Sequence, residues 1–251
     1  MRTTFLVIAS ASIVLGAVDV RAQAVASALS PLDMRVACGP PASLVRPNAL
    51  VPHILGSQDT VPRAVFHEHD MLVVDSGLAS GVQLGQQFFV RRQNTFGTAF
   101  GENALTARTL GWLRIVAVNQ TTAIGAVEHI CDAVMSGDYL EPFVAPSVPA
   151  DAESTEVIGE PDFSALARVV SGPEDRRGVA NGDMMLIDAG ADRGVTPGTR
   201  LAIYRDVQRP GMPLAVVGEA VVVTTGPTVS VARVTKTRDA VQMGDYVVVR
   251  K

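Results

Sequence analysis

The segment DMLVVDSGLASGVQLGQQFFVRR (residues 70–92) decides the fold, because the sequence repeats it as DMMLIDAGADRGVTPGTRLAIYR at residues 183–205. The two copies align without a gap and agree at 8 of 23 positions. After a six-residue deletion the match resumes, and residues 111–140 agree with residues 218–247 at 10 of 30 positions. Chance agreement from composition would be roughly 4 positions over the whole alignment. The body of the chain is therefore a tandem duplication.

Each copy is built from short β-branched or aromatic runs bounded by Gly, Asp or Asn. The runs lie at residues 71–74, 88–90, 115–118 and 124–127, with counterparts at 184–187, 201–204, 220–224 and 229–234. Their spacing is typical of a small barrel or sandwich. We therefore predict an all-β protein with two tandem homologous small β-barrel or sandwich domains. One helical turn is expected at residues 131–135 and again at 238–242.

The matched glycines predict turns. Gly77, Gly81 and Gly85 align with glycines of the second copy, and so does Gly137. Glycine reaches positive φ without steric cost. A phosphate-binding loop would require Lys-Ser/Thr or a helix start after the glycines, and another strand pattern follows instead.

The first 24 residues have the pattern of a secretory signal peptide. A basic start precedes an apolar run from Phe5 to Val18, and Ala22-Gln23-Ala24 or Val20-Arg21-Ala22 supplies a cleavage site. A membrane anchor is the alternative, but a spanning helix needs about 20 apolar residues, and Asp19 and Arg21 interrupt the run. We expect cleavage, a periplasmic or secreted protein, and no transmembrane helix in the mature chain.

Composition divides the chain into five parts. A signal peptide (1–24) is followed by a Pro/Ala-rich arm (25–52), the first β-barrel repeat (53–144), a flexible acidic linker (145–163) and the second β-barrel repeat (164–251). The net charge of −4 and the 5% of aromatic residues disfavour nucleic-acid binding. No cofactor motif is present, so no cofactor is expected.

The two cysteines, Cys38 and Cys131, predict a disulfide, because an even count in an exported protein favours pairing. Two unpaired buried thiols are the alternative. Lipid modification of Cys38 is disfavoured, because Arg35 lies three residues before it and the apolar run ended far upstream.

The best metal candidate is His67-Glu68-His69-Asp70, in which two histidines could share a strand face. The second copy has Ala180-Asn181-Gly182-Asp183 there, so a solvated turn is favoured over a weak metal site. A structural zinc site requires four ligands, usually with Cys. We predict no metal site and leave the role of His67 and His69 open.

No catalytic residue is predicted. Ser76 aligns with Ala189, and no nucleophile elbow is present. Four aspartates, Asp70, Asp75, Asp132 and Asp138, recur in the second copy. Such recurrence is typical of scaffold aspartates at turns, although a hydrolase with duplicated carboxylates is the alternative.

Trp112 and Arg114 are the candidate interface residues. Strand alternation places them on one face, with Leu113 and Ile115 on the other. Glu219 replaces Trp112 in the second copy, which predicts a solvent-facing tryptophan that could anchor a partner. A tryptophan folded over the edge of its own barrel is favoured over this interface anchor. The long loop at residues 93–110 is a second candidate contact surface.

The pattern D-x-(apolar)3-D-x-G-x3-G-V-x2-G, followed by a glycine-led strand and a closing G-D-Y, resembles small β-barrel modules of exported bacterial proteins. Both copies are similar to the C-terminal domain of flagellar assembly protein T, over about 160 residues in all. The resemblance implies a Gram-negative-type envelope and a scaffolding role. The other domains of that family have no match in this sequence, so the resemblance extends to the β-barrel module alone.

These patterns favour a non-catalytic envelope scaffold or assembly module that binds an envelope protein or larger assembly of unknown identity. Strand addition at a barrel edge is one mode of such binding. The alternative is a cell-wall or polysaccharide-binding module, in which two copies would supply avidity. Proximity to peptidoglycan is expected in either case.

Overall fold

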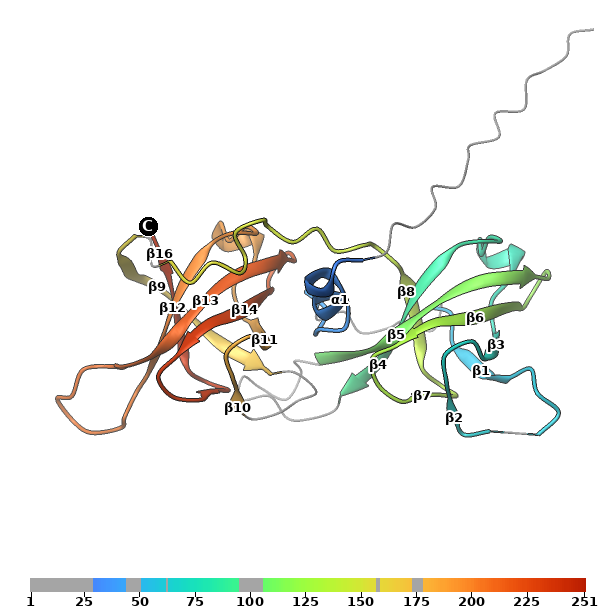
Figure 1. Cartoon of the computed structure of the whole chain (residues 1–251), viewed down its shortest axis with the longest axis horizontal. Coiled ribbons are helices and arrows are strands. Elements are labelled where there is room, and N and C mark those ends of the chain that lie inside the picture. The colour runs from blue at the N-terminus through green and yellow to red at the C-terminus, as the bar shows by residue number, and fades with distance from the viewer. Residues whose placement is uncertain (1–28, 44–50, 62, 95–105, 157–158, 173–177) are drawn as a thin grey trace, which may run out of the picture.

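The computed structural model describes residues 29–43, 51–61, 63–94, 106–156, 159–172 and 178–251. The predicted signal peptide and residues 95–105 of the long loop lie outside these ranges. Two curled β-units lie side by side, with helix α1 (Pro31–Ala37) between them (Figure 1). The predicted all-β fold with two tandem units is confirmed.

The first unit is a curled six-stranded sheet in the order β1-β3-β6-β5-β4-β8. Its strands are β1 (Ile54–Ser57), β3 (Met71–Val74), β4 (Gln87–Asn94), β5 (Thr106–Val118), β6 (Ala123–Ile130) and β8 (Tyr139–Pro142), with the short pair β2 (Val65–Phe66) and β7 (Val134–Met135) beside them. A bridge between His53 and Tyr139 joins the two edges of the sheet. The unit is therefore a nearly closed barrel.

The second unit is a closed barrel in the equivalent order β11-β14-β13-β12-β16-β9. Its strands are β9 (Pro161–Ser171), β11 (Met184–Ile187), β12 (Arg200–Arg205), β13 (Ala215–Thr225), β14 (Ser230–Thr237) and β16 (Tyr246–Arg250), with the short pair β10 (Gly178–Val179) and β15 (Val241–Gln242). The long strand β9 pairs with both β11 and β16, which closes the barrel.

The duplication extends to the irregularities of the sheets. Register shifts occur in the first unit at Val90/Arg91, Trp112/Leu113 and Ile115/Ala117, and in the second at Ile203/Tyr204, Glu219/Ala220 and Val222/Thr224. These positions are equivalent in the sequence alignment. Because a bulge bends its strand and increases the local twist, the two copies share their curvature as well as their strand order.

Two kinds of glycine shape the turns. Gly81 and Gly194 end the 3-10 turns η1 (Leu78–Ser80) and η3 (Ala191–Arg193) with φ of 81° and 73°, as the turn prediction requires. Gly77 has an extended φ of −138°, and a Cβ there would lie 2.3 Å from the carbonyl oxygen of Asn119. At Gly77 close backbone approach, and not positive φ, requires glycine.

The helical turn predicted at residues 131–135 and 238–242 is wrong. Each segment bends and then enters the short strand β7 or β15. Asp132 accepts a hydrogen bond from the backbone N–H of Ala133, and Asp239 accepts one from Ala240. A local aspartate–backbone bond of this kind competes with helix formation.

Part of the predicted linker packs against the second unit. Ala152 is fully buried, and Val148 packs beside it against the second unit. Arg200 donates from Nη1 to the carbonyl oxygen of Ser154 at 2.8 Å. Strand β9 also begins at Pro161, before the expected boundary. The contact forms because Val148 and Ala152 are apolar and cover an apolar face of the barrel.

Candidate functional site

Strand β11 of the second barrel is buried on both faces, and so are the central parts of β13 and β14. In β11, Met185 and Ile187 point into the barrel core, while Met184 and Leu186 point outward. All four side chains are at most 4% exposed. The outward side chains join three valines of β13 and β14 to form what we call the covered face: Met184, Leu186, Val221, Val223 and Val231.

The cover of this face comes from the arm and the linker. Leu32, Val36 and Ala42 of the arm, together with Val148 and Ala152 of the linker, pack on it. All five side chains are small or branched and apolar, so they remove the covered face from water. The arm approaches so closely that a Cβ on Gly226 would lie 1.9 Å from the carbonyl oxygen of Ala42.

Among the residues that the structure describes, no segment covers the equivalent face of the first unit. We call it the open face: Met71, Val73, Arg114, Val116 and Ile124, the counterparts of the five residues of the covered face. Met71 is 42% exposed and Val116 43%, whereas Met184 and Val223 are 4% and 1% exposed. Two copies of one face therefore differ in whether a described segment of this chain covers them.

Arg114 lies on the open face as strand alternation predicted. Its Nε atom donates to Glu128 Oε1 at 2.5 Å, and Nη1 donates to the carbonyl oxygen of Gly85. Its side chain is 35% exposed. The guanidinium is thus held in place at the edge of an apolar surface.

The helix of the arm forms for local reasons. Ser30 accepts a hydrogen bond from the backbone N–H of Asp33, and Pro31 takes the first helical position, both of which favour a helix start. Successive helical residues point about 100° apart, so Val36 faces the second unit while Ala37 contacts Phe89 and Trp112 of the first.

Trp112 is not the solvent-facing residue that its Glu219 counterpart predicted. It lies on the outer face of β5, as the alternation required, but is only 6% exposed. Its ring packs beside Phe89, Phe143 and His129 at centroid distances of 6.4, 5.5 and 4.6 Å. The arm covers this cluster with Met34 and Ala37. Trp112 is therefore an anchor for the protein's own arm.

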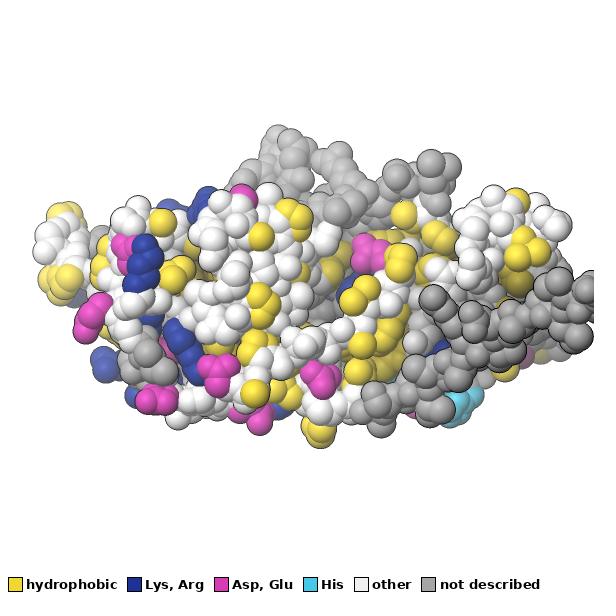
Figure 2. Space-filling model, turned by 90° about the horizontal axis from the view of Figure 1, so that it is seen from above, with side chains coloured by type: hydrophobic (Ala, Val, Ile, Leu, Met, Phe, Trp, Pro, Cys, Tyr) yellow, Lys and Arg dark blue, Asp and Glu magenta, His cyan; other side chains and the backbone are white. Residues whose placement is uncertain are grey.

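A groove of about 550 Å³ lies between the arm, β4, the segment after β8 and the second unit, where Val223 and Val231 line it. Figure 2 shows hydrophobic side chains gathered near the middle of the molecule on the face that carries the linker. On the groove wall, Arg91 Nε lies 3.3 Å from Glu141 Oε2 and the guanidinium lies 4.2 Å from the Phe89 ring centroid. Burial lowers the pKa of the Arg91 guanidinium, and the charge of Glu141 opposes this shift.

Arg91 also fixes the arm. It donates to Thr109 Oγ1, which donates in turn to the carbonyl oxygen of Gly39 at 2.6 Å. Tyr204 occupies the equivalent position of the second unit. This connection to the arm is therefore specific to the first unit.

Cys38 and Cys131 form a disulfide, with their sulfurs 1.99 Å apart. It joins the end of α1 to the turn after β6, and a cavity of about 90 Å³ opens beside it. Arg108 and Asp132 line this cavity and form an ion pair with a separation of 2.6 Å. The disulfide therefore ties the arm covalently to the first unit.

The His67–Asp70 segment is a turn. His67 and His69 are exposed, and His69 has a φ of 70°. The backbone N–H of His67 donates to Asp70 Oδ2 at 2.8 Å, and Ala180 donates to Asp183 in the same way. The structure does not gather further ligands around these two histidines among the residues it describes.

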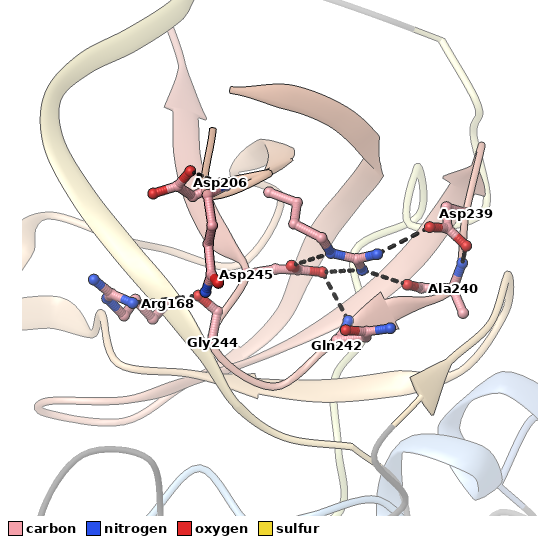
Figure 3. A network of polar contacts seen from close by, with 9 residues as sticks. Arg168, Asp206, Asp239, Ala240, Gln242, Gly244 and Asp245 are labelled. Atoms are coloured by element: carbon pink, nitrogen blue, oxygen red, sulfur yellow. Dashed lines mark hydrogen bonds and ion pairs between the residues drawn. The ribbon is translucent and has the colours of Figure 1, made fainter. Parts of the chain in front are cut away.

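The recurring aspartates make the same bond in both units. Asp75 accepts from the backbone N–H of His53, and Asp188 accepts from Arg168. Asp138 accepts from Met135, and Asp245 accepts from Gln242. Figure 3 shows the turn at Asp245 in the second unit, where the carboxylate also accepts hydrogen bonds from Arg205. Each of these carboxylates has a structural partner.

Sequence reasoning missed the two-sided burial of the second unit. The signal was present: residues 184–187 and 220–223 are continuous apolar runs, and such runs are typical of strands buried on both faces. The first unit has Arg114 in the corresponding run of β5. The sequence also carried a signal for the start of α1. Ser30 is a residue that caps helices, Pro31 suits the first helical position, and Asp33 lies three residues after the cap.

The chain matches no protein-family model and no curated protein. The resemblance to flagellar assembly protein T therefore stays a prediction. Within the described residues no helix combines the length and apolar character needed to span a membrane.

Proposed function

We propose that this chain is a non-catalytic exported protein that acts as an interaction module, with the open face as the surface that binds an envelope partner. The contrast between the two equivalent faces carries the proposal. In the second unit the face is covered by the chain's own arm and linker. In the first unit Met71 and Val116 remain exposed, and a contiguous exposed apolar patch is typical of an interaction site.

The second unit also indicates the chemistry of the partner. Its covered face receives a short helix and an extended segment that present small or branched apolar side chains, among them Leu32, Val36 and Val148. A partner segment of the same kind would fit the open face, since the two units share their strand order and three equivalent register shifts. Arg114 at the edge favours a partner segment that carries an acidic residue or a free carbonyl group there.

Site-specific photo-crosslinking in cells tests this proposal. A crosslinker at Val116 should form an adduct with a discrete envelope protein, which mass spectrometry would identify. Val216 is the matched control, because it is a strand valine of the second unit with an exposed fraction of 42%. Substitution of Met71 by Asp should abolish the adduct at Val116. Equal adducts at both valines, or none at Val116, would contradict the proposal.

The polysaccharide-binding alternative has less support. Trp112, the side chain best suited to stack on a sugar ring, is buried under the arm. Retention on purified sacculi that survives the Met71→Asp substitution would favour this alternative over the protein-binding proposal.

A further inference from the structure

A cluster of three metal-ligating side chains lies at the disulfide. The sulfurs of Cys38 and Cys131 and a ring nitrogen of His129 all lie within 4.8 Å of one another, and all three residues are partly buried. We propose that, when the disulfide is reduced, these three residues bind one zinc ion.

The geometry needs little change. With Zn–S distances of about 2.3 Å and a Zn–N distance of about 2.0 Å, tetrahedral angles place two sulfurs about 3.8 Å apart and a sulfur and a nitrogen about 3.5 Å apart. Once the S–S bond is broken, the sulfurs must separate by less than 2 Å, and the imidazole nitrogen lies within about 1.3 Å of its required distance. Side-chain rotation can supply both movements.

A carboxylate lies beside one ring nitrogen of His129. Its Nδ1 atom lies 3.0 Å from Glu68 Oε1, and its ring packs against Trp112 with a centroid distance of 4.6 Å. A carboxylate on one ring nitrogen is the usual outer partner of a zinc-bound histidine, because it fixes the ring and directs the other nitrogen to the metal. The arrangement leaves Nε2 as the ligand atom.

The second unit lacks the cluster. Lys236 and Arg238 stand at the positions equivalent to His129 and Cys131. The first unit therefore departs from the repeat at both ligand positions that lie within it, and its third ligand comes from the arm. This makes the site a property of the assembled arm and first unit, and not of the barrel fold.

Reduction of the disulfide requires a reductant, and a dithiol can supply the electrons and protons. A dithiol reductant transfers two electrons and two protons to the Cys38–Cys131 disulfide, which gives two thiols and an oxidised dithiol. Zinc binding then releases the two thiol protons to solvent, and the thiolates bind the metal. The cavity of about 90 Å³ beside the two cysteines gives access from solvent, and water would complete the fourth position.

Cobalt(II) titration of the mature protein tests the proposal. After reduction with a phosphine under anaerobic conditions, the protein should bind one equivalent of Co²⁺, with thiolate-to-cobalt charge-transfer bands and the visible bands of a tetrahedral site. Added Zn²⁺ should bleach these bands and raise the melting temperature of the reduced protein. The oxidised protein should show neither effect.

Three variants with intact cysteines, two at histidines and one at Glu68, make the test specific. His129→Gln should weaken Zn²⁺ binding by reduced protein about tenfold or more, and Glu68→Gln by about tenfold, as for other outer-shell changes. His67→Gln is the control, because His67 is exposed, and it should bind as the natural sequence does. Binding unchanged by His129→Gln, absence of tetrahedral cobalt bands, binding of Cu⁺ without Zn²⁺, or loss of β-structure on reduction would each overturn the proposal.

Discussion

Arg92 and Asp138 form a two-point ion pair, with Nε donating to Oδ1 at 2.7 Å and Nη2 donating to Oδ2 at 2.8 Å. Arg205 makes the same pair with Asp245 in the second unit, at 2.8 Å for both bonds. The hydrogen bonds to the carboxylate are the main cause that raises the pKa of each guanidinium. Each arginine also donates to the backbone of the turn before the last strand, at Ala133 or Ala240.

Substitution of Asp138 by Ala should therefore destabilise the first unit. The carboxylate is 3% exposed and its arginine 29%, and removing one partner of a buried pair costs about 3–5 kcal/mol, less where solvent reaches the pair. We expect about 2–3 kcal/mol in urea unfolding monitored by circular dichroism. Asp192→Ala is the control, because Asp192 is exposed and its counterpart is Ala79; its effect should be within about 0.5 kcal/mol. Equal effects of the two substitutions would refute the structural role.

Trp112→Ala should lower stability by about 3–5 kcal/mol, because it leaves a cavity beneath the arm and removes the aromatic contacts with Phe89 and Phe143. Thermal and urea unfolding measure the change. Leu84→Ala is the comparison, since Leu84 is 63% exposed and should tolerate the change. An effect of Trp112→Ala as small as that of Leu84→Ala would mean that the arm does not pack on this cluster in solution.

Removal of the disulfide should reduce stability by about 2–4 kcal/mol. The bond joins residues 93 apart in sequence, and a loop of this length restricts the unfolded chain strongly. The paired substitution Cys38→Ala and Cys131→Ala, measured by urea unfolding, checks the value. The native β-structure should persist, since Val36 and Ala37 still pack on the two units.

The two kinds of glycine should respond differently to alanine. Gly137→Ala should cost about 1 kcal/mol, because its φ is 89° but nothing lies within 4 Å of the added Cβ. Gly77→Ala should cost more than twice as much, because the added Cβ would lie 2.3 Å from the carbonyl oxygen of Asn119. The urea midpoints of the two variants measure the two losses of stability. A larger loss for Gly137→Ala than for Gly77→Ala would show that the close approach of the Asn119 carbonyl oxygen does not constrain Gly77.

Export should leave a mature chain that begins after Ala24 or, at the second site, after Ala22. Mass spectrometry of the N-terminal peptide from fractionated cells identifies the cut, because signal peptidase selects small residues at these positions. Ala24→Tyr should block the first site, whereas the same change at Ala26 should not. A chain that retains Met1 in the membrane fraction would support the anchor alternative.

Much of the fold follows from local sequence. The predicted runs at residues 71–74 and 184–187 are strands β3 and β11 with the same bounds, because alternating or continuous β-branched side chains suit a pleated surface. Less of the candidate site follows. Strand alternation predicted the outward direction of Arg114 correctly. The exposure of Met71 and Val116 indicates a binding surface only by comparison with their counterparts, Met184 and Val223, which are covered.

By itself the sequence determined the duplication, the strands marked by apolar runs, the turns at Gly81 and Gly194 and the outward direction of Trp112, since each depends on the spacing of neighbouring residues. Only the tertiary structure decided what lies over each outward face. Burial of a face depends on segments far apart in the chain, here the arm near Val36 and the linker near Ala152. The periodicity within one strand does not indicate which distant segment covers its outward face. The Glu219 counterpart therefore indicated a solvent-facing Trp112, and the sequence did not distinguish the open face from the covered face.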